Sequence, residues 1–448
     1  MATDTITPTL FETVESGVRS YARSFPGIFT SAKGDLLFTE SGERYIDFLS
    51  GAGTLNYGHS PDCIKRELIG YLERDGLMHG LDLSTSAKAD FLDALRTFVL
   101  TPRGLDYKVQ FTSPTGTNAV EAALKLARLA TGRTNVVAFS GGFHGVSAGS
   151  LAATASGYFR QGLHATLNHV THIPYPDSPL GEFDSLDLLR RMVEDPSSGV
   201  EKPAAVLLET VQGEGGVWVA PVPFLQGLRE LCDEHGILLV VDDIQAGCGR
   251  TGTFFSFERA EIVPDLVTLS KSIGGYGLPL AVLLLKPELD IWQPGQHNGT
   301  FRGNQLAFVA AASALRHYWS DDTFCQRVRT KGELVTELLQ RRVVEPLGVR
   351  VRGLGLMQAV DVSGVPGLNA AEVSRRCFEK GLVVEVCGRA DEVLKILPPL
   401  TISQVSLSAG LTILIDSLAE LHPAAAVPAG RNDQKDQHDL TTNGATTA

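Results

Sequence analysis

Apolar runs of strand length alternate with helix-like segments from about residue 60 onward. Apolar residues recur at helical spacing in Cys63–Leu72 and in Asn118–Ala130. Runs of strand length are Val136–Phe139, Ala204–Glu209, Ile237–Asp242, Leu266–Leu269 and Leu280–Leu285. Strands that are apolar on both faces and separated by helices are typical of a mostly parallel sheet covered on both sides. The pattern therefore predicts an α/β fold built on such a sheet.

The two ends of the chain follow other patterns. Residues 36–48 alternate around Ser41-Gly42, which predicts a small hairpin. Beyond about residue 320 the chain shows a helix, strands at Val349–Arg352 and Gly355–Val362, a second helix and a strand at Leu382–Val386. We therefore expect four regions. They are an N-terminal segment at 1–60 that packs with the small domain, a large domain at 61–320, a small α+β domain at 321–423 and a disordered tail at 424–448.

Composition narrows the class of protein. The 448 residues carry a net charge of -12 and no basic stripe, which argues against a nucleic-acid partner. No apolar run of bilayer length and no signal-peptide pattern are visible, so we expect no membrane partner and a cytoplasmic location. The six cysteines are scattered without a CxxC pair, which indicates reduced thiols with neither disulfides nor metal ligands.

A lysine and an aspartate carry the strongest chemical signal. Lys271 follows the apolar run 266–269 in a glycine-flanked turn, and Asp242 ends the run 237–242. A lysine in such a turn can form a Schiff base with pyridoxal phosphate (PLP), and a buried carboxylate can keep the pyridine nitrogen protonated as an electron sink. Gln245 can hydrogen-bond the phenolic oxygen. Together these residues predict a PLP-dependent amine-transfer enzyme.

Two glycine-containing segments are candidates for the phosphate group. A strand at Lys108–Thr112 leads into a turn with Gly116 and Thr117, and a helix is predicted to open at about Asn118. Free N–H groups and the helix dipole favour an anion there. An ordinary capped helix explains the same residues. Thr300, in a glycine-rich loop, is a second candidate donor.

Further polar and aromatic residues follow the predicted strands 136–139 and 204–209. Phe143 and His144 lie in a glycine-rich turn, where the ring of Phe143 can stack on a cofactor. A core phenylalanine beside a loop histidine is the simpler alternative. Glu209 and Glu214 stand where a buried strand ends, so each needs a partner unless it lies in a solvated loop.

With these motifs assembled, residues 20–422 resemble the class III (ω-type) PLP-dependent aminotransferases. The resemblance implies the aspartate aminotransferase-like fold (fold type I) and a homodimer or higher homo-oligomer with shared active sites. It implies that Lys271 carries the cofactor, with Asp242, Gln245, Phe143 and His144 around its ring. Gly116 and Thr117 are implied to hold the phosphate, and Thr300 to reach it from the neighbouring subunit.

Within the family, the pattern is most similar to members that move the amino group of L-glutamate to L-aspartate 4-semialdehyde, forming L-2,4-diaminobutyrate. This product serves ectoine synthesis, and it also serves siderophores and peptide antibiotics. Val146 stands where enzymes for 4-aminobutyrate often have Arg, which argues against that substrate. Lys395 stands where many relatives have an Arg that alternates between a Glu partner and the substrate carboxylate. Lys395 and Glu214 are expected to form the analogous pair, although a lysine lacks the Arg fork.

Several alternatives stay open at this level. Arg23 or Arg19 can share the binding of the substrate carboxylate, or can form surface ion pairs instead. Ornithine, lysine and 4-aminobutyrate are alternative amine donors in this broad family. An aminomutase or racemase of the same fold would retain Lys271 and Asp242, and so would not be distinguished by these motifs. A non-catalytic relative is expected to have lost them.

Overall fold

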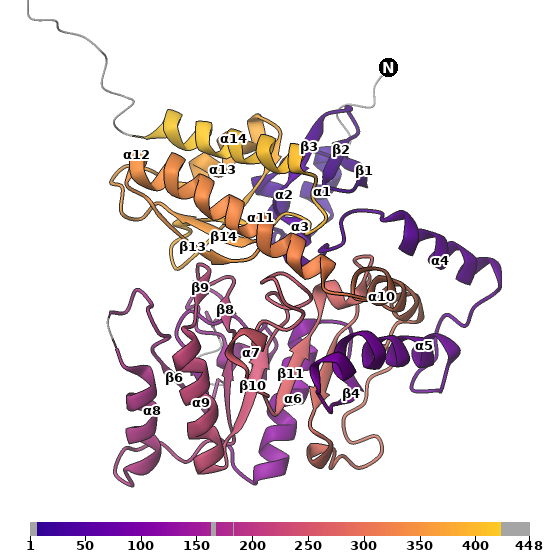
Figure 1. Cartoon of the computed structure of the whole chain (residues 1–448), viewed down its shortest axis with the longest axis vertical. Helices are drawn as coiled ribbons and strands as arrows, with labels where there is room; N and C mark the ends of the chain where they lie inside the picture. Colours follow the sequence, from indigo (N-terminus) through magenta and orange to yellow (C-terminus); the bar gives the residue numbers. More distant parts are fainter. Residues whose placement is uncertain (1–6, 163–166, 182, 423–448) are drawn as a thin grey trace, which may run out of the picture.

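Seven strands form one sheet at the centre of the larger part of the molecule (Figure 1). The computed structural model describes residues 7–162, 167–181 and 183–422, so the predicted tail at 424–448 lies outside it. In spatial order the strands are β4 (Lys108–Phe111), β12 (Val282–Leu285), β11 (Leu266–Leu269), β10 (Leu238–Asp242), β7 (Ala205–Leu208), β5 (Val136–Phe139) and β6 (Val170–Ile173). Only β12 runs antiparallel to its neighbours, which confirms the mostly parallel sheet.

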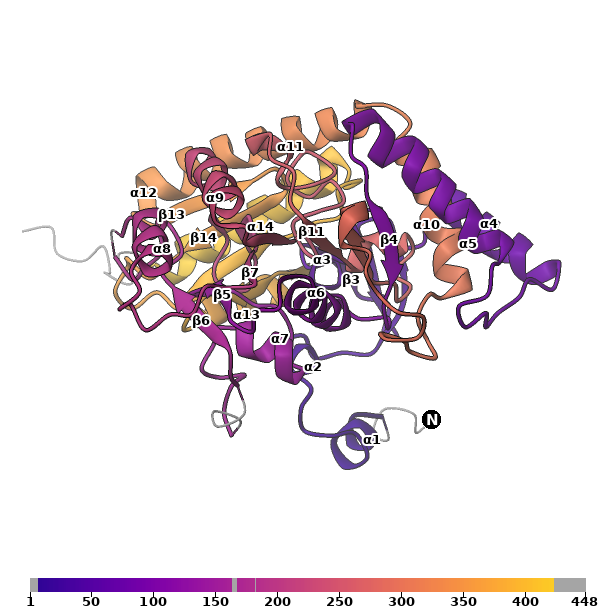
Figure 2. The ribbon, with the colours of Figure 1, turned by 90° about the horizontal axis from the view of Figure 1, so that it is seen from below.

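Both faces of this sheet are buried. Successive side chains of a strand point to opposite sides, so neighbouring residues belong to different apolar clusters. Val240 and Leu266 belong to the apolar cluster that includes helix α6 (Gly116–Thr131), whereas Val241 and Val267 belong to the cluster on the other face, with α9 (Val222–His235). Figure 2 shows α6 and α9 on opposite sides of the strands. Further helices of this part are α4 (Asp62–Glu73), α5 (Ser86–Leu95), α7 (Ala148–Ala153), α8 (Ser185–Glu194) and α10 (Gln305–Tyr318).

Two smaller sheets lie above the large one in Figure 1. One is antiparallel, in the order β13 (Arg350–Leu354), β14 (Met357–Asp361), β17 (Val393–Ile396) and β16 (Glu385–Cys387). The other joins β1 (Phe29–Lys33), β2 (Leu36–Thr39) and β3 (Arg44–Asp47) to β15 (Leu382–Val383). Helices in this part are α1 (Thr7–Thr13), α2 (Tyr21–Ser24), α3 (Ser50–Gly53), α11 (Thr323–Leu339), α12 (Glu345–Leu347), α13 (Ala370–Glu379) and α14 (Gln404–Leu421).

Two predicted boundaries were wrong in an informative way. Helix α6 begins at Gly116 and not at Asn118, because Thr115 is the capping residue. The predicted strand 382–386 is two strands, since β15 pairs with β3 and β16 pairs with β17. A single apolar run therefore serves two sheets. The predicted hairpin at 36–48 is confirmed by the antiparallel pairing of β2 with β3.

Helix α14 is apolar enough to raise the question of a membrane. Among the described residues it alone has the length and composition of a membrane-crossing helix, with a mean hydropathy of 1.2, whereas no such run was expected from the sequence. Its buried positions Leu407, Leu411, Leu414 and Leu418 are spaced by three or four residues and so form one stripe. A single buried stripe is typical of a helix that covers a protein core.

Candidate active site

Two neighbouring strands bring Lys271 and Asp242 to the same edge of the large sheet. Asp242 is the last residue of β10 and lies opposite Thr268 of the parallel strand β11. Lys271 comes two residues after β11 and adopts a left-handed backbone with φ of 51°. A lysine seldom adopts this strained conformation, which tends to occur at functional sites. The carboxyl edge of such a sheet is also where α/β proteins bind ligands.

Asp242 is buried, and both of its carboxylate oxygens have partners. Its Oδ2 lies 2.7 Å from His144 Nδ1, while its Oδ1 accepts hydrogen bonds from Thr268 Oγ1 at 3.2 Å and from the Ile244 N–H at 3.2 Å. Burial acts to lower the pKa of His144, but the hydrogen bond and charge of Asp242 outweigh it and raise that pKa. A protonated His144 stabilises the ionised carboxylate. His144 therefore contacts Asp242 directly and orients it.

Lys271 and Gln245 share one backbone acceptor. The Nζ of Lys271 donates to the Ala52 carbonyl at 2.8 Å, and Nε2 of Gln245 donates to the same oxygen at 3.1 Å. Burial lowers the pKa of Lys271, which favours a neutral amine. The Oε1 of Gln245 is buried and has no hydrogen-bond partner among the described residues. A free amine beside an unsatisfied amide and a buried carboxylate fits the donor set that PLP needs.

The first turn of α6 supplies the candidate phosphate site. Gly116 and Thr117 are its first two residues, and N–H groups at a helix start have no partner within the helix. The Thr117 hydroxyl interacts with the hydroxyls of Ser147, at 2.7 Å, and of Ser150. Since both neighbours engage this hydroxyl, we expect the backbone N–H of Thr117 to be its main contribution.

Thr300 lies at the same end of the site but is exposed. The residue before it, Gly299, packs so closely on this turn that a β-carbon there would lie 2.6 Å from Ser113 Oγ. The loop therefore reaches the segment that precedes α6. Its exposed threonine stays a predicted donor to a partner subunit.

Phe143 and Glu209 connect the turn after β5 to the turn after β7. The Phe143 N–H donates to Glu209 Oε2 at 3.0 Å, and the Gly213 N–H donates to Oε1 at 3.2 Å. Burial raises the pKa of Glu209 to about 7. The ring of Phe143 is half-buried and meets Phe159 edge-on, with centroids 5.2 Å apart. Glu209 thus holds the backbone that presents the Phe143 ring.

A cluster of charges borders this site on the side of the small domain. Lys395 on β17 is fully buried, and its Nζ lies 2.6 Å from Glu214 Oε1 and 3.2 Å from Glu385 Oε1. Gln245 Nε2 also donates to Glu214 Oε1, at 3.3 Å. The Tyr21 hydroxyl donates to Glu385 Oε2 at 3.2 Å. Lys395 and Glu214 thus lie next to each other, as predicted, and three further residues join them: Glu385, Gln245 and Tyr21.

The pKa values of this cluster follow from burial and mutual attraction. Burial opposes the charged forms, but the two carboxylates outweigh it and raise the pKa of Lys395 well above its ordinary value. For Glu214 the charge of Lys395 also outweighs burial and lowers the pKa to about 2. Burial dominates at Glu385 and raises its pKa. Lys395 and Glu214 therefore form a stable ion pair near neutral pH.

Comparison with known proteins decides the family. Residues 19–418 match the family described as aminotransferase class-III. The chain is a class III aminotransferase. Diaminobutyrate–2-oxoglutarate transaminases from Bordetella parapertussis and Vibrio parahaemolyticus are 52% and 54% identical to it, over 93% and 92% of this chain and 97% and 98% of their own. Members of this family use PLP, as the sequence predicted.

Solved structures agree with the predicted fold. An ornithine aminotransferase from Toxoplasma gondii matches with a TM-score of 0.80 at 24% identity, covering 92% of this chain and 94% of its own. An S-selective transaminase from Arthrobacter matches with a TM-score of 0.82 at 24% identity, covering 92% and 97%. At this identity the match shows the fold alone, which is fold type I.

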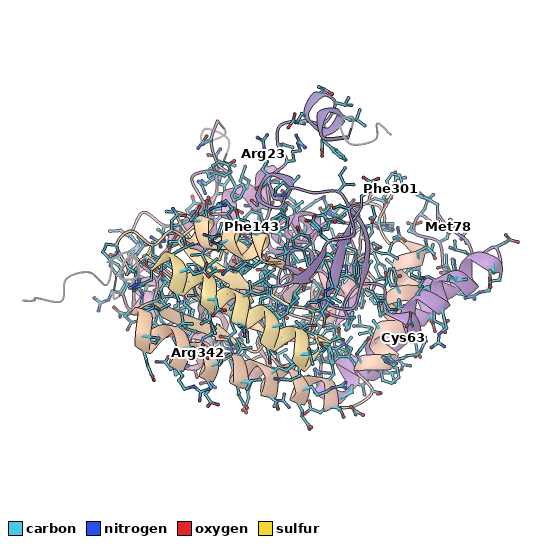
Figure 3. All side chains as sticks on the ribbon, turned by 90° about the horizontal axis from the view of Figure 1, so that it is seen from above. Arg23, Cys63, Met78, Phe143, Phe301 and Arg342 are labelled. Atoms are coloured by element: carbon cyan, nitrogen blue, oxygen red, sulfur yellow. The ribbon has the colours of Figure 1, made fainter. Side chains whose placement is uncertain are left out.

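The structure places Arg23 of this class III aminotransferase away from the charge cluster. Its exposed guanidinium donates to the backbone carbonyls of Arg19 and Gly17, each at 3.0 Å, and Figure 3 shows it at the edge of the molecule near the N-terminal helix. Arg19 lies 3.8 Å from Glu15. A role of either arginine in binding the substrate stays a prediction. Tyr21, between them, reaches the cluster instead.

Sequence reasoning missed Glu385 and Tyr21. Glu385 interrupts the apolar run 382–386, and a buried acid in a strand requires a partner, which was the available signal. Its partner Lys395 lies directly opposite on β17, a pairing that only the register of the sheet reveals. Tyr21 is separated from Glu385 by 364 positions along the chain, and no local pattern links them.

Proposed function

We propose that this aminotransferase moves the amino group of L-glutamate to L-aspartate 4-semialdehyde, giving 2-oxoglutarate and L-2,4-diaminobutyrate. The observation that carries the proposal is the similarity, at 50–54% identity over more than 90% of the chain, to proteins named diaminobutyrate–2-oxoglutarate transaminase. The cluster around Lys395 supports it, because the site must accept an α-amine in one half-reaction and a γ-amine in the other.

The residues at the sheet edge are suited to proton transfer at the substrate carbon. When bound, PLP supplies an electron sink that stabilises negative charge at that carbon. We assign to Lys271 the attachment of the cofactor and, once its amine is free, the removal and return of the proton as base and acid. Asp242, oriented by His144, would hold the pyridine nitrogen of the cofactor. Gly116 and Thr117 bind the phosphate with their N–H groups.

The Lys395–Glu214 pair is our candidate for the group that accommodates two different substrates. Glutamate presents a carboxylate to this wall, and Lys395 can bind it when Glu214 moves aside. Glu214 has a partly exposed side chain (33%), whereas that of Lys395 is fully buried, so Glu214 is the partner that can move. We expect Glu214→Ala to change the two half-reaction rates unequally in single-turnover kinetics. Unchanged rates in both would contradict this role.

We also propose a cytoplasmic homodimer or higher homo-oligomer, and ectoine synthesis as the use of the product. The six cysteines are free thiols, which suits a reducing compartment.

Large apolar residues are exposed on one flank, namely Leu77, Met78, Leu81, Leu83 and Phe301. Figure 3 shows Met78 and Phe301 on the same side of the molecule, and His79 contacts the Phe301 ring at 5.3 Å between centroids. Such a patch suits an interface between subunits.

The test is a single-turnover experiment with each substrate in turn. The PLP-loaded enzyme is mixed with L-glutamate, and the absorbance of the cofactor and the yield of 2-oxoglutarate are recorded. L-aspartate 4-semialdehyde is then added, and L-2,4-diaminobutyrate is quantified by mass spectrometry. We expect one equivalent of each product. Formation of 2-oxoglutarate without diaminobutyrate would reject the acceptor, and no reaction with glutamate would reject the donor.

A further inference from the structure

Helix α3 is a single turn of left-handed helix. Its four residues, from Ser50 to Gly53, have φ values of 49°, 58°, 55° and 85°. L-residues other than glycine seldom adopt a positive φ, and Ser50 and Ala52 are two such residues, so the turn is strained. Strain of this kind persists only where surrounding contacts hold the backbone in place, and it tends to occur at functional sites.

Asp47 holds the start of this turn. It is buried, and its Oδ1 accepts hydrogen bonds from the N–H groups of Leu49 and Ser50, each at 2.8 Å. Its Oδ2 lies 2.7 Å from Nε2 of His59, which fixes the carboxylate itself. A buried carboxylate needs partners, and two of the partners here are backbone groups at the start of the turn. The position of the turn therefore depends on the side chain of Asp47.

Ser272 holds the end of the turn. Its hydroxyl donates to the Gly53 carbonyl at 2.9 Å, and Ser272 directly follows Lys271 in the chain. Between these two anchors, the turn directs the Ala52 carbonyl at Lys271, whose Nζ donates to it at 2.8 Å. Because φ and ψ set the direction of each carbonyl, a right-handed turn would point this oxygen elsewhere. The contact with the lysine amine therefore depends on the left-handed backbone.

We propose that Asp47 is a positioning residue for Lys271. By fixing the left-handed turn, Asp47 holds the Ala52 carbonyl where it orients the free amine. The inference rests on the proposed role of Lys271, whose amine nitrogen forms a C=N bond with the aldehyde carbon of PLP as one water molecule leaves. A lysine side chain loses rotamer freedom when it is fixed, so an orientation that is set in advance favours attachment.

The test compares two ligands of the cofactor-free enzyme. PLP carries an aldehyde and can attach to Lys271, whereas pyridoxamine phosphate carries an amine in its place and cannot. In absorbance titrations, we expect Asp47→Ala to weaken binding of PLP about tenfold or more, equal to about 1.4 kcal/mol, and to keep binding of pyridoxamine phosphate within about twofold of the wild type. Asp47→Asn keeps an acceptor oxygen for the two N–H groups and should restore most of the affinity for PLP.

Asp361→Ala is the matched control. Asp361 is also buried, and it also accepts a hydrogen bond from the N–H two residues later, that of Ser363 at 2.9 Å. It lies on β14 and has no printed contact with the turn 50–53 or with Lys271. The control should keep the wild-type affinity for both ligands.

Three results would overturn the inference. Equal weakening of both ligands would show that Asp47 supports the site as a whole, and unchanged binding of PLP would show that the turn does not orient the amine. An effect of Asp47→Ala that persists in the Lys271→Ala background would show that the amine is not the group affected. If mass spectrometry after borohydride reduction finds no PLP on Lys271 of the wild type, the proposed function fails, and the inference fails with it.

Should Asp47→Ala not fold, Ser272→Ala tests the same turn from its other end. This variant loses the hydrogen bond to the Gly53 carbonyl and should weaken the binding of PLP alone. Ser270→Ala is its control, because Ser270 is also buried beside Lys271 but donates to the Leu280 carbonyl, at 3.0 Å. Equal effects of the two serine variants would contradict a role of the turn.

Discussion

Single buried charges determine what the sheet edge can do. The carboxylate of Asp242 pairs with the ring of His144, whereas buried Glu209 accepts hydrogen bonds from the backbone N–H groups of Phe143 and Gly213. Backbone N–H groups stabilise a carboxylate less than a full positive charge does. The sequence predicted that acids at strand ends need partners. The sequence did not reveal that Asp242 and Glu209 have different kinds of partner.

Glu209 gives a prediction about stability and pH. Its pKa is raised by burial from about 4.5 to about 7, so between these values the folded protein holds a proton that the unfolded chain has lost. Stability therefore falls as pH rises through this range, by up to about 3 kcal/mol from this residue. The Glu209→Gln variant has no ionisable group at this position, so it does not lose this stability as pH rises. We expect the unfolding free energy of the variant minus that of the wild type to rise from pH 4.5 to pH 8.

Urea denaturation at fixed protein and cofactor concentration measures this difference. Asp243 is also buried with a pKa raised to about 7, but it is present in both proteins and cancels in the comparison. Exposed Glu230→Gln serves as the control and should give a flat difference. A flat difference for Glu209→Gln as well would show that Glu209 titrates at its ordinary pKa.

At the scale of elements, the start of α6 connects sequence to cofactor binding. The Thr115 side chain accepts a hydrogen bond from the backbone N–H of the third helical residue, and the Asn118 side chain accepts one from the backbone N–H of Thr115. This capping box defines where the helix begins. Gly116 follows at once, and its α-carbon faces Ile244, so that an added β-carbon would lie 2.8 Å from Ile244 Cδ1. Ile244 is two residues after Asp242. The helix start and the end of β10 are therefore packed as one unit.

Gly116→Ala tests this unit. The added methyl group must push Ile244 away and so disturb both the phosphate site and the backbone beside Asp242. We expect PLP to bind the variant at least about tenfold more weakly, equal to about 1.4 kcal/mol, by titration of the cofactor-free enzyme. Gly70→Ala, within α4 and with only Arg74 Nη1 at 3.5 Å, is the matched control. If the two variants bound PLP with equal affinity, Gly116 would not be part of the phosphate site.

The segment 382–388 shows why element boundaries escape a local pattern. Leu382 and Val383 pair with β3, and two residues later Glu385 pairs with Lys395 of β17. The change of partner happens within one apolar run, since each pair of residues satisfies its backbone groups in a different sheet. Glu385 interrupts the run, but its residue type does not show that the strand changes partner there. Only the positions of the distant strands impose it.

At the scale of the whole molecule, the exposed apolar flank formed by Leu77, Met78, Leu81, Leu83 and Phe301 bears on assembly. Phe301 is 68% exposed and lies one residue from Thr300, the predicted donor to a neighbouring subunit's phosphate. If the flank is an interface, assembly completes the active site. Activity and oligomeric state should then change together.

Phe301→Asp tests whether assembly and activity are linked. A charge in an apolar interface is costly, so we expect monomers in analytical ultracentrifugation and a turnover per chain that falls in proportion to the monomer fraction. Val405→Asp, at an apolar residue that is 80% exposed on α14, should leave both properties as in the wild type. A fully active monomer would contradict the predicted sharing of active sites.

The sequence by itself determined every strand of the large sheet except β6, the positions of Asp242 at the end of one strand and of Lys271 just after another, and the family. These features are encoded locally, because a short continuous apolar run and a glycine-flanked turn after it depend on adjacent residues. The tertiary structure decided which charges meet. His144 with Asp242, and Glu385 and Tyr21 with Lys395, are brought together by strand order and register. The cost of burying a charge demands a partner, but only the fold selects which one.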